Sequence, residues 1–146
     1  MISRDEAIQL LHTYAKDDHD LLWKSYAVEH ILILLSKELD EDEKVWGLTG
    51  LLYDLDYEYT SKNPENHTLI TANIVVGLVP DDAIEAIKSH NYLYTAFRSK
   101  SIMGSGFHVI IPSMEEDNKT KNNQQQTIVH VLIKRYGLRR TRKSGR

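Results

Sequence analysis

The chain has 146 residues, of which 41% are hydrophobic, and this length suits a single domain with a core of its own. Its net charge is −3 and it contains no cysteine, which excludes disulfide bonds and thiolate metal sites. No stretch reaches the ~20 apolar residues that a membrane helix needs, and the N-terminal residues lack the pattern of a secretion signal. We therefore expect a cytoplasmic protein that does not contact membranes.

Charge is distributed unevenly along the chain. Residues 1–100 carry 9 Lys and Arg against 18 Asp and Glu, whereas residues 101–146 carry 9 against 3. The hydrophobic signal for helices also weakens after Asn91. This change predicts a helical domain over residues 1–95 and a divergent C-terminal segment, partly flexible with a basic tail, over residues 96–146.

Three helices are predicted in the first half of the chain from apolar residues at helical spacing. Ser3 and Glu6 form a capping-box pattern that starts the first helix, with an apolar face of Ala7, Leu10, Leu11 and Tyr14. The second helix carries an apolar stripe from Leu21 to Leu39. Asp40 is predicted to cap the third helix, which has Glu43 at the capping-box position.

Two further helices are predicted after Asn63-Pro64, which interrupts the pattern. The fourth begins near Glu65 and ends at Gly77, and the fifth begins at Pro80 and runs to His90. Five helices with short connections predict an all-α bundle. The end of the third helix also brings Asp54 and Asp56 into one region.

Several motifs between Met1 and about Asn91 resemble the HD superfamily, a group of helical metal-dependent phosphohydrolases named for an adjacent His-Asp pair. The resemblance covers roughly two thirds of the chain and is carried by Ile2-Ser3-Arg4-Asp5-Glu6-Ala7, Ala27-Val28-Glu29, Trp46 to Leu52, Asp54-Leu55-Asp56-Tyr57-Glu58, His67 and Ile87-Lys88-Ser89-His90-Asn91. It implies an HD-like bundle of five or more helices and hydrolysis of phosphoesters.

The resemblance also implies a metal site, of which this chain keeps a part. Asp54, His67 and His90 match ligand positions, and Asp54 is implied to serve in catalysis. Lys24 and Tyr53 stand where the family has histidines, and the family's last aspartate has no match after Asn91. The implied ion is divalent, such as Mn, Ni, Fe, Mg or Zn, and would activate a water molecule.

The two replaced ligands leave two interpretations open. A protonated lysine has no lone pair, and a tyrosine phenol must first lose a proton with a reference pKa of about 10. Asp54, His67 and His90 would then form a weak three-ligand site in a metal-dependent phosphohydrolase. Alternatively, the Lys24 ammonium lies beside Asp54 in place of a metal, and a catalytically inactive pseudoenzyme binds a small phosphorylated molecule or nucleotide through Lys24 and the two histidines.

Asp56 and Glu58 follow Asp54 along the chain and offer two more carboxylates. Both could support a metal ligand through hydrogen bonds, as carboxylates near metal sites often do. A solvent-facing turn is the simpler expectation for both residues.

The C-terminal segment suggests other classes of function. Phe107 to Ile111 is a short apolar run, and Thr127 to Tyr136 has a spacing that suits a helix or a strand. Five cationic residues between Arg139 and Arg146 would attract nucleic acid or another anionic partner by electrostatics alone. No nucleic-acid motif accompanies them, so nucleic-acid binding is expected only through this tail. A purely structural or interaction module is the third possibility.

Overall fold

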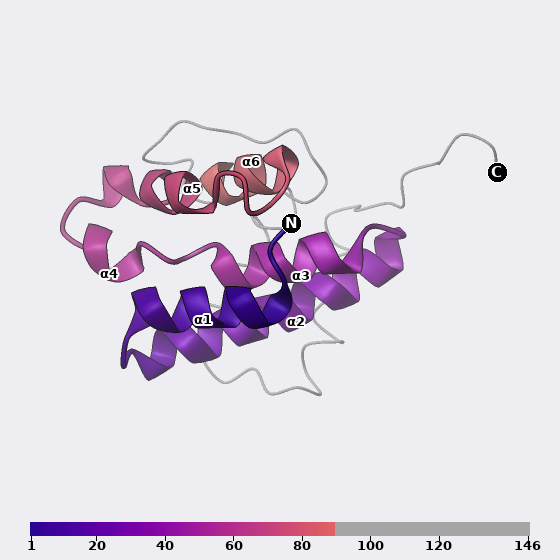
Figure 1. The fold of residues 1–146 in the computed structure, drawn as a ribbon, viewed down its shortest axis with the longest axis horizontal. Coiled ribbons are helices and arrows are strands. Elements are labelled where there is room, and N and C mark those ends of the chain that lie inside the picture. Colours follow the sequence, from indigo (N-terminus) through magenta and orange to yellow (C-terminus); the bar gives the residue numbers. More distant parts are fainter. Residues whose placement is uncertain (90–146) are drawn as a thin grey trace, which may run out of the picture.

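The computed structural model describes residues 1–89, which form two layers of helices (Figure 1). One layer holds α1 (Arg4–Ala15), α2 (His19–Leu39) and α3 (Glu43–Leu52). The short α4 (Tyr57–Thr60) and a 3-10 turn (Pro64–Asn66) lead to the other layer, which holds α5 (Leu69–Val75) and α6 (Asp81–Ser89). Over these residues there is no strand, only an isolated bridge between Val76 and Val79, so the all-α prediction is confirmed for this part of the chain.

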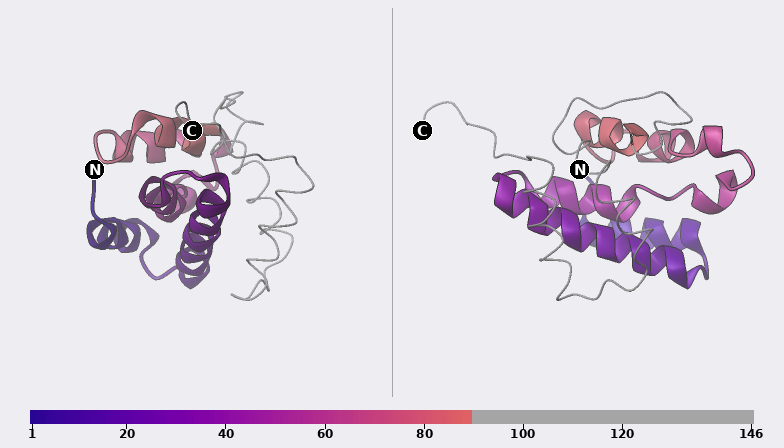
Figure 2. Two further views of the ribbon diagram at one scale, coloured as in Figure 1. Left: turned by 90° about the vertical axis from the view of Figure 1, so that its right-hand side faces the viewer. Right: turned by 180° about the vertical axis from the view of Figure 1, so that it is seen from behind.

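The core lies around α3, which packs against α1, α2 and α6. Figure 2 shows α3 between α1 and α2 on one side and α5 and α6 on the other. Among the described helices, α2 and α3 make the most extensive contact. Gly50 permits this approach, because a Cβ atom there would lie only 2.8 Å from the backbone nitrogen and Cα of Glu29.

An ion pair and an aromatic pair attach other elements to this core. Arg4, at the start of α1, donates two hydrogen bonds to the buried carboxylate of Glu29, at 2.7 and 2.9 Å. Bidentate geometry of this kind gives a strong charge-assisted contact. The ring of Tyr59 on α4 meets the ring of Tyr14 on α1 edge to face, with centroids 6.1 Å apart. Both contacts reach α1, which thereby touches both α2 and α4.

The helix caps agree with the sequence at α1 and differ at α3. Ser3 and Glu6 form the predicted capping box. The side chain of Asp42, not that of Asp40, accepts hydrogen bonds from the backbone N–H groups of Lys44 and Val45 at the start of α3. Asp40 instead ends α2 in a left-handed conformation with φ 56°. The prediction of Asp40 as the cap of the third helix was therefore wrong by two residues.

The predicted fourth helix is shorter than expected. Residues 64–66 form the 3-10 turn, and the α-helix begins only at Leu69 because Thr68 has a positive φ of 75°. It ends at Val75, and Gly77 follows with φ 79°.

Several predictions lie outside the described residues. They concern His90, the segments 107–111 and 127–136, the basic tail and the boundary near residue 95. Among the described helices, none is both long and apolar enough to cross a membrane.

Candidate functional site

The candidate site lies where the chain leaves α3. Tyr53 is the C-cap residue of α3 and is fully buried, as is Leu55 two residues later. These two side chains anchor the turn in the core. Asp54 lies between them with only 2% of its surface exposed, so its carboxylate is held away from bulk water.

Lys24 reaches Asp54 from α2. Its Nζ lies 3.6 Å from Asp54 Oδ2, and the lysine side chain is 21% exposed. The same ammonium lies 5.4 Å from the ring centroid of Tyr57, which is close enough for a cation–π contact. Lys24 therefore connects the buried carboxylate to a half-exposed aromatic ring at the surface.

His67 contacts two carboxylates, one with each ring nitrogen. Its Nε2 lies 3.0 Å from Asp54 Oδ1, and its Nδ1 lies 2.5 Å from Asp56 Oδ1. The imidazole is 17% exposed, and the ring of Tyr57 meets it edge to face at 6.3 Å. We refer to Lys24, Asp54, Asp56 and His67 as the charge cluster.

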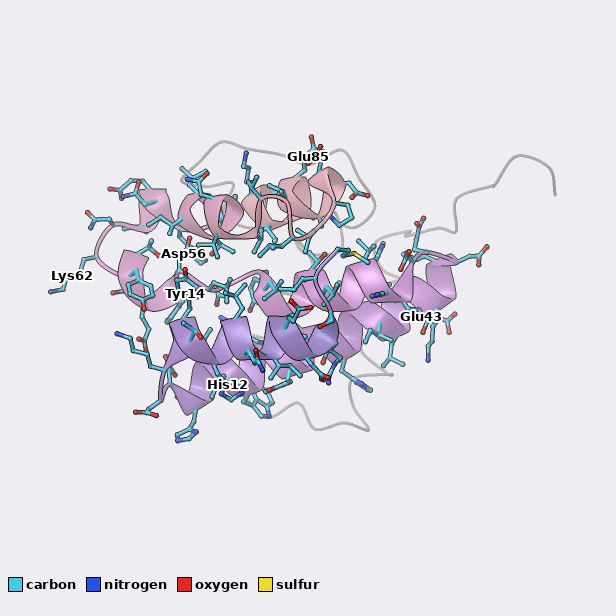
Figure 3. All side chains as sticks on the ribbon, in the orientation of Figure 1. His12, Tyr14, Glu43, Asp56, Lys62 and Glu85 are labelled. Carbon is cyan, nitrogen blue, oxygen red and sulfur yellow. The ribbon has the colours of Figure 1, made fainter. Side chains whose placement is uncertain are left out.

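Asp56 is a central member of the charge cluster and is fully buried. Its Oδ2 accepts a hydrogen bond from the Thr71 N–H at 2.9 Å, and its own N–H donates to Thr71 Oγ1 at 3.1 Å. Its carbonyl accepts the Thr60 hydroxyl at 2.8 Å. Figure 3 shows Asp56 near α4, between the two layers. The expectation of a solvent-facing turn was wrong for Asp56, because these bonds hold it inside. Glu58 is exposed as expected, but it lies on α4 and not in a turn.

The two carboxylates stabilise the protonated form of His67. Burial alone would lower the pKa of His67, but the hydrogen bonds and negative charges of Asp54 and Asp56 outweigh burial and raise the pKa from 6.5 to about 9. At neutral pH the ring is an imidazolium that donates one N–H hydrogen bond to each aspartate. The charge cluster then holds two positive and two negative groups.

As arranged here, the charge cluster does not fit a divalent metal. A metal ligand must present a lone pair, and an imidazolium with both N–H groups directed at carboxylates presents none. The Lys24 ammonium also occupies a position 3.6 Å from Asp54 Oδ2. Within residues 1–89 no group of three or more histidine, aspartate or glutamate side chains is disposed to hold a metal ion.

The structure brings together three of the site residues named from the sequence. Lys24 and His67 both contact Asp54, and Tyr53, the residue before Asp54, is buried. His90 lies outside the described residues. Asp56, which was not among the residues expected to form the site, is a central member of the charge cluster, and the Asp-Leu-Asp alternation after an apolar helix is a sequence signal for it.

Comparisons with known proteins identified no relatives of this chain. No protein-family model matches the chain, and no curated protein and no solved structure is significantly similar to it.

Proposed function

We propose that the chain is an HD-type phosphohydrolase-like protein that works without a metal and binds a phosphate-containing ligand instead of hydrolysing it. The proposal is carried by one observation, the approach of Lys24 Nζ to within 3.6 Å of Asp54 Oδ2. In the HD-type arrangement that the sequence resembles, the corresponding aspartate faces a cation. Here an ammonium provides that positive charge.

The charge balance of the cluster supports the metal-free interpretation. Lys24 and protonated His67 neutralise the charges of Asp54 and Asp56, so an added divalent ion would bring excess positive charge. The ion would also have to displace a proton from His67, whose pKa of about 9 lies two units above neutral. That displacement alone costs about 3 kcal/mol at pH 7.

The same groups offer contacts to a phosphate. Lys24 is partly exposed and can donate charge-assisted hydrogen bonds to an oxyanion from the solvent side. Without a metal to lower the pKa of a bound water molecule, hydrolysis would be slow. We therefore expect binding without turnover.

The first test is calorimetric titration of the full chain with Mn²⁺ and Ni²⁺. We expect no binding by the native protein and a gain of binding in the double variant Lys24→His plus Tyr53→His, which restores both imidazoles. Lys44→His is the matched control, because Lys44 is an exposed lysine on α3 away from the charge cluster. Stoichiometric binding by the native protein that is lost in Asp54→Ala would instead favour an active metal-dependent phosphohydrolase.

The second test measures the binding of inorganic phosphate to the native chain by calorimetry. Lys24→Met should weaken binding at least tenfold, since it removes the charge and keeps the length of the side chain, and Lys44→Met should leave it unchanged. If the native chain binds no phosphate, the ligand-binding part of the proposal is wrong.

A further inference from the structure

Thr68 combines a positive φ with a buried, β-branched side chain. Three non-glycine residues in the described part of the chain have a positive φ, namely Lys16, Asp40 and Thr68. Lys16 and Asp40 follow the ends of helices at positions that solvent reaches, but Thr68 is fully buried. It is also β-branched, and a β-branched residue at φ 75° is a genuine outlier. Such strain persists only where the surrounding structure enforces it.

The surrounding contacts explain what enforces this conformation. Thr68 lies between His67 and Thr71, and both residues donate to the carboxylate of Asp56. The imidazole Nδ1 of His67 meets Oδ1, and the backbone N–H of Thr71 meets Oδ2. In this structure the backbone reaches that arrangement through the positive φ of Thr68, which lies directly between the extended His67 and the first residue of α5.

A second contact fixes Thr68 from the other side. Its hydroxyl donates to the carbonyl of Lys88 at 3.4 Å, near the end of α6, and its carbonyl accepts the Ala72 N–H at 2.8 Å, in the first turn of α5. The turn is thus attached to both helices of the second layer.

We propose that Thr68 is a positioning residue, whose positive backbone φ directs the His67 imidazole between Asp54 and Asp56. This inference rests on the proposed function in treating the charge cluster as the site. The test of this inference measures the His67–Asp56 contact directly. Its outcome is therefore independent of the metal and phosphate titrations that test the proposed function.

Two substitutions separate the backbone conformation from the side chain. Thr68→Gly permits a positive φ, whereas Thr68→Pro fixes φ near −65°. His67 already has φ −59° and ψ 138°, which is the conformation that a following proline favours. Proline therefore conflicts with the structure mainly through φ at position 68.

The readout is the NMR resonance of the His67 Nδ1–H proton, assigned by its loss in His67→Gln. We expect this resonance to be protected from water exchange in the native chain and in Thr68→Gly, and to be lost in Thr68→Pro. A Thr68→Pro variant that folds and retains the protected proton would overturn the proposal.

A second measurement applies if Thr68→Pro does not fold. Thr68→Gly and Thr68→Ala remove nearly the same atoms, but alanine is strained at positive φ, so the glycine variant should melt about 4 °C or more above the alanine variant. In an Asp56→Asn background this difference should shrink, because the contact that enforces the turn is weakened. The Lys16→Gly and Lys16→Ala pair is the control and should keep its difference in both backgrounds. An undiminished difference at position 68 would contradict the proposal.

Discussion

Asp56 shows how one buried carboxylate can organise a site. It has no exposed surface, and its two oxygens accept hydrogen bonds from the His67 imidazole and from the Thr71 backbone. A buried carboxylate is stable in the charged form only when it is paired and hydrogen-bonded, and here both conditions are met. The positions of His67 and of the first turn of α5 therefore depend on the same side chain.

Replacing Asp56 with asparagine tests this dependence. Asn can still accept a hydrogen bond from Thr71, but it cannot pair with the imidazolium. We expect Asp56→Asn to lower the free energy of unfolding by about 2 kcal/mol and to lower the pKa of His67. Urea denaturation and NMR titration measure the two effects. Exposed Glu58 lies two residues away, and the control Glu58→Gln should change the stability by no more than about 0.5 kcal/mol.

Sequence patterns could identify some residues of this site but not the hydrogen bonds that connect them. Asp54 and His67 stand out through their motif context, and the structure brings them within 3.0 Å. The burial of Asp56 depends on Thr71, fifteen residues later, whose own sequence context contains no sign of the contact. Long-range hydrogen bonds of this kind have no local period or spacing, so periodicity could not reveal them.

The α2–α3 pair is the central element of the fold, and its close approach depends on one glycine. At Gly50 a Cβ atom would lie 2.8 Å from backbone atoms of Glu29, and a helix backbone cannot shift locally to make room. At Gly47 a Cβ atom would lie 3.0 Å from side-chain atoms of Ile33, which can change rotamer. The two glycines of α3 therefore offer a matched comparison.

We expect Gly50→Ala to destabilise the protein by roughly 2 kcal/mol, because overpacking at a backbone contact forces the helices apart. Gly47→Ala should be close to neutral, since the gain in helix propensity of about 1 kcal/mol offsets the displacement of Ile33. Urea denaturation of both variants gives the comparison. Equal effects of the two substitutions would mean that the close approach at Gly50 does not limit the packing.

Helix existence was easier to predict from sequence than helix ends. Apolar residues recur at regular helical spacing along α1, α2, α3 and α6, and each of these helices is found in the structure. The start of α3 was misplaced because Asp40 and Asp42 are equally good caps in sequence, and the left-handed end of α2 decides between them. The start of α5 was misplaced because a tertiary contact, not a local signal, holds Thr68 out of the helix.

At the scale of the whole molecule, the charge cluster joins the two layers of helices. Lys24 comes from α2 in the first layer, Asp54 and Asp56 from the turn after α3, and His67 from the segment that leads into α5. These contacts add electrostatic attraction to the apolar contact between α3 and α6. The attachment between the layers should therefore depend on the protonation of His67.

This dependence predicts how stability varies with pH. The folded-state pKa of His67 is about 9, above the value of 6.5 expected in the unfolded chain. Because folding raises the pKa, the protonated ring stabilises the fold fully below about pH 6.5, and this stabilisation is lost as the pH rises to about 9. The shift corresponds to a contribution on the order of 3 kcal/mol. Urea denaturation between pH 6 and 10 measures it, with His67→Gln as the control. If the native chain and His67→Gln lose stability in parallel over this range, the imidazolium does not hold the layers together.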